Sequence, residues 1–85
     1  MRKEKKLSKA INNLIYAQNI FIEDNSPITN GLFDLCQDER MAIVDLMNDY
    51  TNLDDIDTNL VNRIINTGKS MKAIAHEYKK IDLIC

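Results

Sequence analysis

Apolar residues recur at helical spacing through the first quarter of this 85-residue sequence, and this pattern constrains the fold more than any other feature. Large apolar side chains return every three or four residues over 7–22, which is the period of an α-helix with a buried face. We therefore predict a first helix from about Lys5 to Glu23. Tyr16 and Ile20 flank the main stripe, so the apolar arc of this helix is wide.

A wide apolar arc is difficult for one small chain to cover, because a domain of this length has a marginal core. Three further short helices of the same chain are expected to cover one side of the arc. A second copy related by a twofold axis would cover the rest, since one sequence then completes both cores. We therefore predict a homodimer rather than a monomer.

The next segment predicts a loop and then a second helix. Residues 23–31 should interrupt the first helix, because Pro27 disfavours a helical residue before it and Asn30-Gly31 is a turn dipeptide. A second helix is expected at about 37–50, with acids near its start that suit the helix dipole. Met41 and Val44 are expected on its buried face.

The last third of the chain predicts two more helices. A third helix should run from about 58 to 67 and end at Gly68, which would serve as a C-cap. Ser70 is a suitable N-cap for a fourth helix over 71–80. Only two glycines and one proline interrupt the sequence, and no segment shows sustained period-two alternation. We therefore predict an all-α fold, a small bundle of about four helices.

Residues 70–85 also resemble half of a DNA-binding motif. Ala73-Ile74-Ala75 between charged flanks is typical of the first helix of a helix-turn-helix, where a small residue permits a close helix crossing. The alternative is an amphipathic helix that closes the core.

Charge changes sign twice along the chain, although the net charge is only −2. Five bases and one acid fall in residues 1–10, ten acids and one base in 23–59, and five bases and two acids in 60–85. Because an acidic centre repels phosphate, contact with nucleic acid is expected from the ends. Residues 1–6 are expected to be a frayed basic terminus. Pairing between chains and a solvated surface are the alternative roles of these charges. The candidate phosphate contacts are Lys69, Lys72, Lys79 and Lys80.

The residue patterns of enzymes and metal sites are absent from the sequence. His76 is the only histidine, and Cys36 and Cys85 are too few and too far apart for a metal cluster or a disulfide scaffold. We therefore predict no catalytic residue, no cofactor and no metal, and a protein that is not an enzyme. No apolar run reaches the roughly 18–20 residues that span a bilayer, and no signal peptide is visible, so a cytoplasmic protein is expected.

The segment Asn13–Leu46 resembles the N-terminal core of the FlhD family, the helical subunit of the bacterial flagellar activator FlhD–FlhC. The shared pattern is an apolar run ending in Ala-Gln, a second apolar stretch before Asp, a short loop, and an acidic helix start with Met-Ala. The segment Leu60–Gly68 is similar to the next helix of that family. The matching elements are Leu14-Ile15-Tyr16, Ala17-Gln18, Ile20-Phe21-Ile22, Asp24, Phe33-Asp34-Leu35 and Asp38-Glu39-Arg40-Met41-Ala42.

This resemblance implies one FlhD-like domain over residues 1–85 that forms an intertwined homodimer and activates transcription with an FlhC-type partner. Contact with DNA is expected within that complex, because the helical region that helps FlhD proteins contact DNA is shortened here. The alternative function is a stand-alone interaction protein, an antagonist or chaperone of a partner, without DNA binding. The implied subunit interface is Leu14, Ile15, Gln18, Phe21, Ile22 and Phe33.

Overall fold

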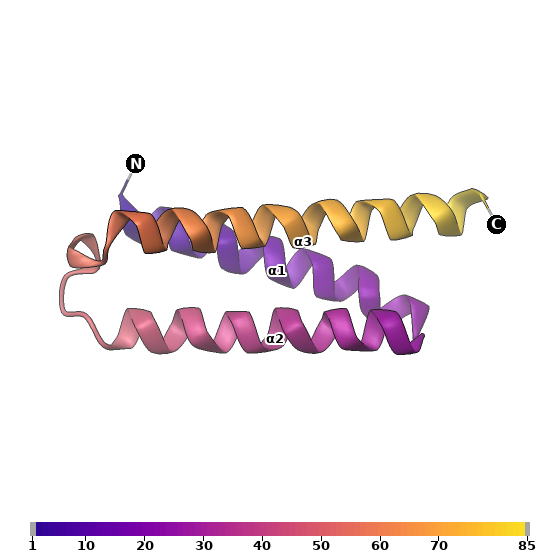
Figure 1. The fold of residues 1–85 in the computed structure, drawn as a ribbon, viewed down its shortest axis with the longest axis horizontal. Helices are drawn as coiled ribbons and strands as arrows, with labels where there is room; N and C mark the ends of the chain where they lie inside the picture. Colours follow the sequence, from indigo (N-terminus) through magenta and orange to yellow (C-terminus); the bar gives the residue numbers. More distant parts are fainter. Residues whose placement is uncertain (1, 85) are drawn as a thin grey trace.

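The structure is a computed structural model that describes residues 2–84, with side chains described as far as Lys80. Three long helices make up almost all of it (Figure 1). They are α1 (Lys3–Asp24), α2 (Pro27–Asn48) and α3 (Thr58–Ile84), and a short 3-10 helix η1 (Leu53–Asp55) lies in the loop before α3. The predicted all-α fold is confirmed for these residues. None of the helices described has the combination of length and hydropathy that crossing a bilayer requires.

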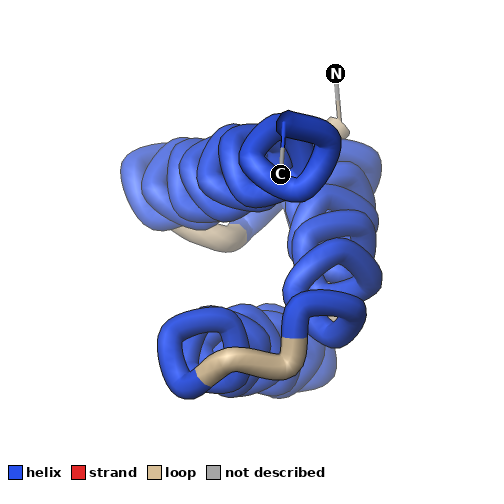
Figure 2. Tube along the Cα trace, turned by 90° about the vertical axis from the view of Figure 1, so that its right-hand side faces the viewer, coloured by secondary structure: helices blue, strands red, loops and turns tan. Residues whose placement is uncertain are grey.

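The central helix of the fold is α1, which packs against both of the other helices. α1 and α3 run in the same direction, and α2, which connects them in the sequence, runs in the opposite direction (Figure 1). Seen along the bundle, the three helices form an open arc, with α2 and α3 at its two ends (Figure 2). The arc leaves one side of α2 and one side of α3 without a neighbouring helix.

The core is built on a seven-residue repeat in α1. Leu7, Leu14 and Phe21 are each fully buried, because residues seven apart lie on nearly the same side of a helix. Ala10 and Ala17 lie beside this row and are also buried. Their small side chains allow another helix to approach closely. The other helices and the loop contribute Cys36, Ile43, Ile56, Val61, Ile64 and Ala75 to the same core.

The prediction of about four helices is wrong, because α3 continues through the expected break at Gly68 and Ser70. Gly68 is not a C-cap, and no glycine among the described residues has a positive φ. Instead, a Cβ atom at Gly68 would lie 3.2 Å from the backbone oxygen of Ala10 and 3.3 Å from its Cα. The glycine therefore permits close packing of α3 on α1. Because α3 is unbroken from Thr58 to Ile84, Ala73-Ile74-Ala75 lies inside one long helix.

The start of the second helix was also predicted wrongly, by about ten residues. The loop after α1 consists only of Asn25, in the left-handed conformation with φ 43°, and Ser26, the N-cap of α2. Ser26 and Thr29 form a capping box: the backbone N of Thr29 donates to Ser26 Oγ at 3.2 Å, and the backbone N of Ser26 donates to Thr29 Oγ1 at 2.9 Å. Pro27 occupies the first helical position, where its missing N–H costs nothing.

The basic N-terminus is held against the loop that precedes α3. The backbone N of Lys3 donates to Asp54 Oδ1 at 3.3 Å. The Lys3 ammonium donates to the backbone oxygen of Asp54 at 2.8 Å and to that of Ile56. α1 therefore begins at Lys3, so four of the six residues expected to fray are helical.

Candidate nucleic-acid and protein interfaces

Four lysines from two helices gather where α1 lies against α3. One hollow at this contact is lined by Lys6, Lys9 and Lys69, and a second hollow by Lys9, Lys69 and Lys72. The two hollows share Lys9, Lys69 and Asn13, so they form one continuous depression along the helix contact. We refer to Lys6, Lys9, Lys69 and Lys72 as the lysine seam.

The sequence produces this seam because neither helix carries an acid along it. No Asp or Glu occurs in 5–22 of α1 or in 59–76 of α3. The two segments lie side by side because Gly68 allows α3 to approach α1 at Ala10. Lysines that are about 60 residues apart in the sequence thus share one surface, and their charges add there.

An aromatic pair lies at the far end of the seam. The Tyr16 and His76 rings are tilted by 33° with centroids 5.3 Å apart, and the Tyr16 hydroxyl is 3.3 Å from His76 Nε2. The Lys72 ammonium lies 5.4 Å from the centroid of the Tyr16 ring, within the range of a cation–π contact. These contacts place Lys72 over α1 and place the lone histidine against Tyr16.

The sequence analysis selected only half of the seam. Lys69 and Lys72 belong to it, whereas Lys79 and Lys80 lie farther along α3 and line neither hollow. Lys80 is 3.5 Å from the carboxylate of Glu77. Lys6 and Lys9 were missed because they were assigned to a frayed terminus or treated only as charge. The small residues Ala10 and Gly68 were the signal that could have paired the two helices.

The residues expected at the dimer interface differ in their exposure in this structure. Leu14 and Phe21 are buried in the chain's own core, and Gln18 is only 3% exposed. Ile15 and Phe33 are half-buried, while Ile22 is 61% exposed. In this structure, therefore, the same chain covers the centre of the expected interface, and Ile22 is its one clearly exposed member.

Gln18 has a different role, as the centre of a polar network between α1 and α2. Its Nε2 donates to the backbone oxygen of Phe33 at 3.3 Å and to Gln37 Oε1 at 3.1 Å. Arg40 Nη1 donates to Gln18 Oε1 at 2.6 Å. Such directional bonds between buried and half-buried groups fix the position of α2 along α1. Arg40 Nε is buried and has no acceptor within the described residues.

Large apolar side chains are exposed along both edges of α2 and on α3. Ile28 and Leu35, seven residues apart, form one row on α2. Met41 and Val44, which were expected to be buried, line a hollow with Ile11 on the opposite edge. Among the residues whose side chains are described, the large apolar ones that are 37–65% exposed are Ile28, Leu35, Met41 and Val44 on α2, Leu60 and Ile74 on α3, Ile22 on α1 and Tyr50 in the loop after α2. Clustered exposure of this kind marks surfaces that bind other proteins.

Cys36 lies in the core and is a free thiol. Burial raises the pKa of this thiol, an effect that the Arg40 charge opposes and the Glu39 charge reinforces. A thiol that stays protonated is a poor nucleophile. Cys36 is therefore a small core residue, and Cys85 lies outside the described residues.

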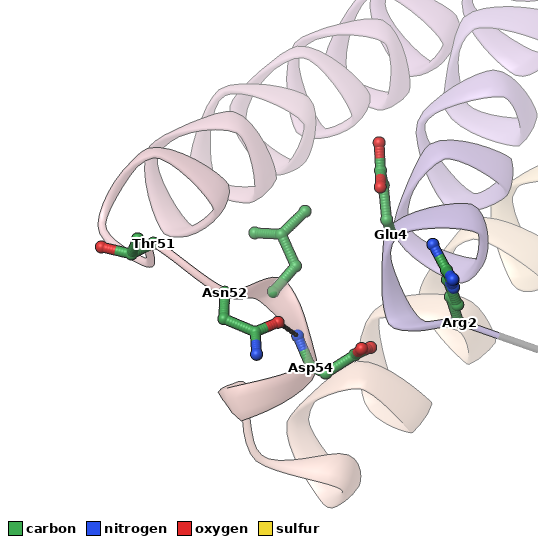
Figure 3. Close-up of a pocket in the computed structure, with 6 residues that line it drawn as sticks. Arg2, Glu4, Thr51, Asn52 and Asp54 are labelled. Carbon is green, nitrogen blue, oxygen red and sulfur yellow. Dashed lines mark hydrogen bonds between the residues drawn. The ribbon is translucent and has the colours of Figure 1, made fainter.

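A polar hollow of about 330 Å³ lies between the start of α1 and the loop after α2 (Figure 3). Arg2, the residue before α1, and Glu4 of α1 line it on one side, and Thr51, Asn52 and Asp54 line it from the loop. Asn52 Oδ1 accepts a bond from the backbone N of Asp54 at 3.1 Å, so this asparagine caps η1. Among the side chains described, as far as Lys80, no group of three His, Cys, Asp or Glu residues is arranged to hold a metal ion.

Comparisons with protein-family models, with curated proteins and with solved structures found no match to this chain. The two kinds of surface, the lysine seam and the exposed apolar rows, therefore guide the functional proposal.

Proposed function

We propose that this chain is a helical regulatory subunit that pairs with a second copy of itself and acts with an FlhC-type partner on promoter DNA. The observation that carries the proposal is the exposed apolar rows on the edges of α2, together with Leu60 and Ile74 on α3. Burying such rows against another protein removes apolar surface from water, which contributes roughly 25 cal/mol per Å². A lone chain gains only part of that energy, since these side chains remain 37–65% exposed beside the open arc.

Charge supports a second copy as one of the proteins that cover these rows. α2 carries four acids and one base, whereas α3 carries five bases and two acids. A second copy therefore offers both an acidic and a basic helix to the first. Complementary charges of this kind favour correct pairing and fast association.

A gel-shift experiment tests the regulatory role. The chain, an FlhC-type partner and their mixture are each titrated into promoter DNA. The mixture is expected to shift the DNA at lower protein concentration than either protein alone. Independent shifts, with no gain on mixing, would contradict the proposal.

A stand-alone interaction protein is the second candidate function, and the acidic side of the molecule favours it. α2 and the following loop, residues 27–57, hold eight acids against Arg40 alone. That side repels DNA, yet it carries exposed apolar residues that a protein partner would cover. Stable binding to a purified partner, together with negligible DNA affinity at low salt, would favour this function.

A further inference from the structure

We propose that the lysine seam binds the phosphate backbone of double-stranded DNA, and that it does so without a partner protein. The choice of DNA rests on the proposed function, whereas the site itself rests on the geometry of α1 and α3. Each helix contributes two lysines three residues apart, so each pair spans about one helical turn. The shared hollows place both pairs on one surface.

The positive charge of the seam is not neutralised by the chain. No ion pair involves a seam lysine among residues 2–80, where the side chains are described; the ion pair found there joins Lys80 and Glu77. The residues between the seam lysines are uncharged, and they include Asn13, which can donate to a phosphate oxygen. Four uncompensated ammonium groups therefore face solvent together.

The acidic helix α2 lies on the other side of α1. Gln18 of α1 bonds to α2, whereas Tyr16 and Ala10 of the same helix contact α3. α2 and α3 thus flank α1 from different directions, as Figure 2 shows. The acidic α2 is separated from the seam by the width of α1, so the repulsion expected from the acidic centre of the sequence acts elsewhere.

A duplex fits this surface better than a single strand does. Proteins that bind single strands stack bases on open aromatic faces. The aromatic rings at the seam are Tyr16, which is half-buried, and His76, which lines one hollow. The two rings lie against each other and the Lys72 ammonium lies near the Tyr16 ring, so neither ring is a free stacking platform. The seam can therefore bind nucleic acid only through the phosphate backbone. A duplex presents phosphates at higher density than a single strand does.

The same geometry favours DNA over an anionic membrane. Helices that bind membrane surfaces combine lysines with large apolar side chains that enter the lipid. The nearest exposed large apolar residue on α3 is Ile74, two residues from Lys72 and therefore about 200° around the helix. The apolar residues that line the seam are Ala10, Ile65 and Ala73, which are small or half-buried or both, so the seam presents no large exposed apolar side chain to insert.

Fluorescence anisotropy of a short labelled duplex tests the proposal with the full chain alone. Affinity is measured between about 50 and 200 mM salt, and four phosphate contacts predict a log–log slope of about −3.6. Lys69→Gln with Lys72→Gln should reduce this slope by about two and weaken binding at least tenfold near 100 mM salt, roughly one unit of slope per lysine. Lys6→Gln with Lys9→Gln should have the same effect, although these residues lie on the other helix.

The matched control is Lys79→Gln with Lys80→Gln, which removes the same charge from the same helix outside the seam. This control should leave the slope nearly unchanged. Equal losses from the seam and control pairs would show a response to net charge alone and would overturn the proposal. Absence of binding by the unmodified chain at low salt would also overturn it.

Two further measurements separate the other possible ligands. Vesicles containing anionic lipid should not bind the chain, and binding to vesicles but not to duplex would overturn the assignment to DNA. Sedimentation of K69Q/K72Q should match the unmodified chain, because a loss of mass would mean that the seam holds a second copy instead. If the seam binds DNA but a partner adds nothing in the gel shift, the seam stands and the regulatory role fails. If only the mixture with a partner binds DNA, the regulatory role stands and the proposal that the seam binds DNA by itself fails.

Discussion

At the scale of single residues, the two glycines of this chain show how one residue type serves different purposes inside helices. Gly31 lies in α2 with open space where a Cβ atom would be. Gly68 lies in α3 against the backbone of α1. Neither has a positive φ, so neither is needed for backbone conformation. Only the second is required for packing.

Substitution of the two glycines should therefore change stability in opposite directions. Gly31→Ala should raise the free energy of unfolding by about 1 kcal/mol, the usual gain in helix propensity. Gly68→Ala should lack this gain, because its Cβ would lie 3.2 Å from a backbone oxygen that cannot move aside easily. Gly68→Val should cost about 1–3 kcal/mol, as overpacking does. Urea unfolding of the three variants measures these changes, and a gain at Gly68 equal to that at Gly31 would refute the close packing of α1 and α3.

The buried thiol of Cys36 should make stability depend on pH in the alkaline range. Burial raises its pKa above the ordinary value of 9.0, so in the folded state the thiol stays neutral where the unfolded thiol ionises. The stabilising contribution is complete below pH 9.0 and is lost as pH rises through the folded pKa. The comparison uses a parent that carries Cys85→Ser and the same parent with Cys36→Ala added. Urea unfolding at pH 7 and pH 10 should show that the free energy of unfolding falls less at the higher pH when Cys36 is replaced. Equal losses would mean that the thiol is not shielded.

At the scale of helices, Ser26 and Ser70 allow a test of the observed N-cap against the expected one. Ser26 is the N-cap of α2, whereas Ser70, the expected cap, is an exposed residue inside α3. Ser26→Ala should therefore cost about 1 kcal/mol of stability, the usual effect of losing an N-cap. Ser70→Ala should be neutral or stabilise by a few tenths of a kcal/mol, since alanine has the higher helix propensity. Thermal unfolding followed by circular dichroism measures the stability of both variants. A larger loss of stability for Ser70→Ala than for Ser26→Ala would support a separate fourth helix that begins at Ser70.

The helical character of the chain could be predicted from the sequence, but the number of helices and several of their ends could not. The apolar period of α1 placed that helix within two residues at each end, because a long regular stripe has no competing interpretation. The ends at Gly68 and Gly31 were misread because a glycine that stops a helix and a glycine that admits a neighbour look alike in sequence. Only the position of Ala10 across the contact distinguishes them. The same contact decides which lysines meet, so the seam could be predicted only in part.

At the scale of the whole molecule, the open arc separates three kinds of surface. The lysine seam follows the contact of α1 with α3, the acids lie mainly on α2 and its loop, and exposed apolar rows follow the edges of α2 and α3. The chain is elongated, with extents of 47 × 21 × 16 Å, so it buries less surface per residue than a compact domain does. Under the proposed function, this shape would separate the surface for DNA from the surfaces for protein.

Pairing of two chains is the prediction that tests this shape as a whole. Sedimentation equilibrium at micromolar protein should give a mass near twice 9.8 kDa. Ile28→Gln with Leu35→Gln should reduce the mass to that of one chain without loss of helicity, because these side chains are 65% and 54% exposed and support no part of the core. Met41→Gln with Val44→Gln is the matched control on the opposite edge of α2, where Ile11 already covers part of the surface, and it should leave the pair intact. A single folded chain in the unmodified protein would contradict pairing, and dissociation by the control alone would move the interface to the other edge.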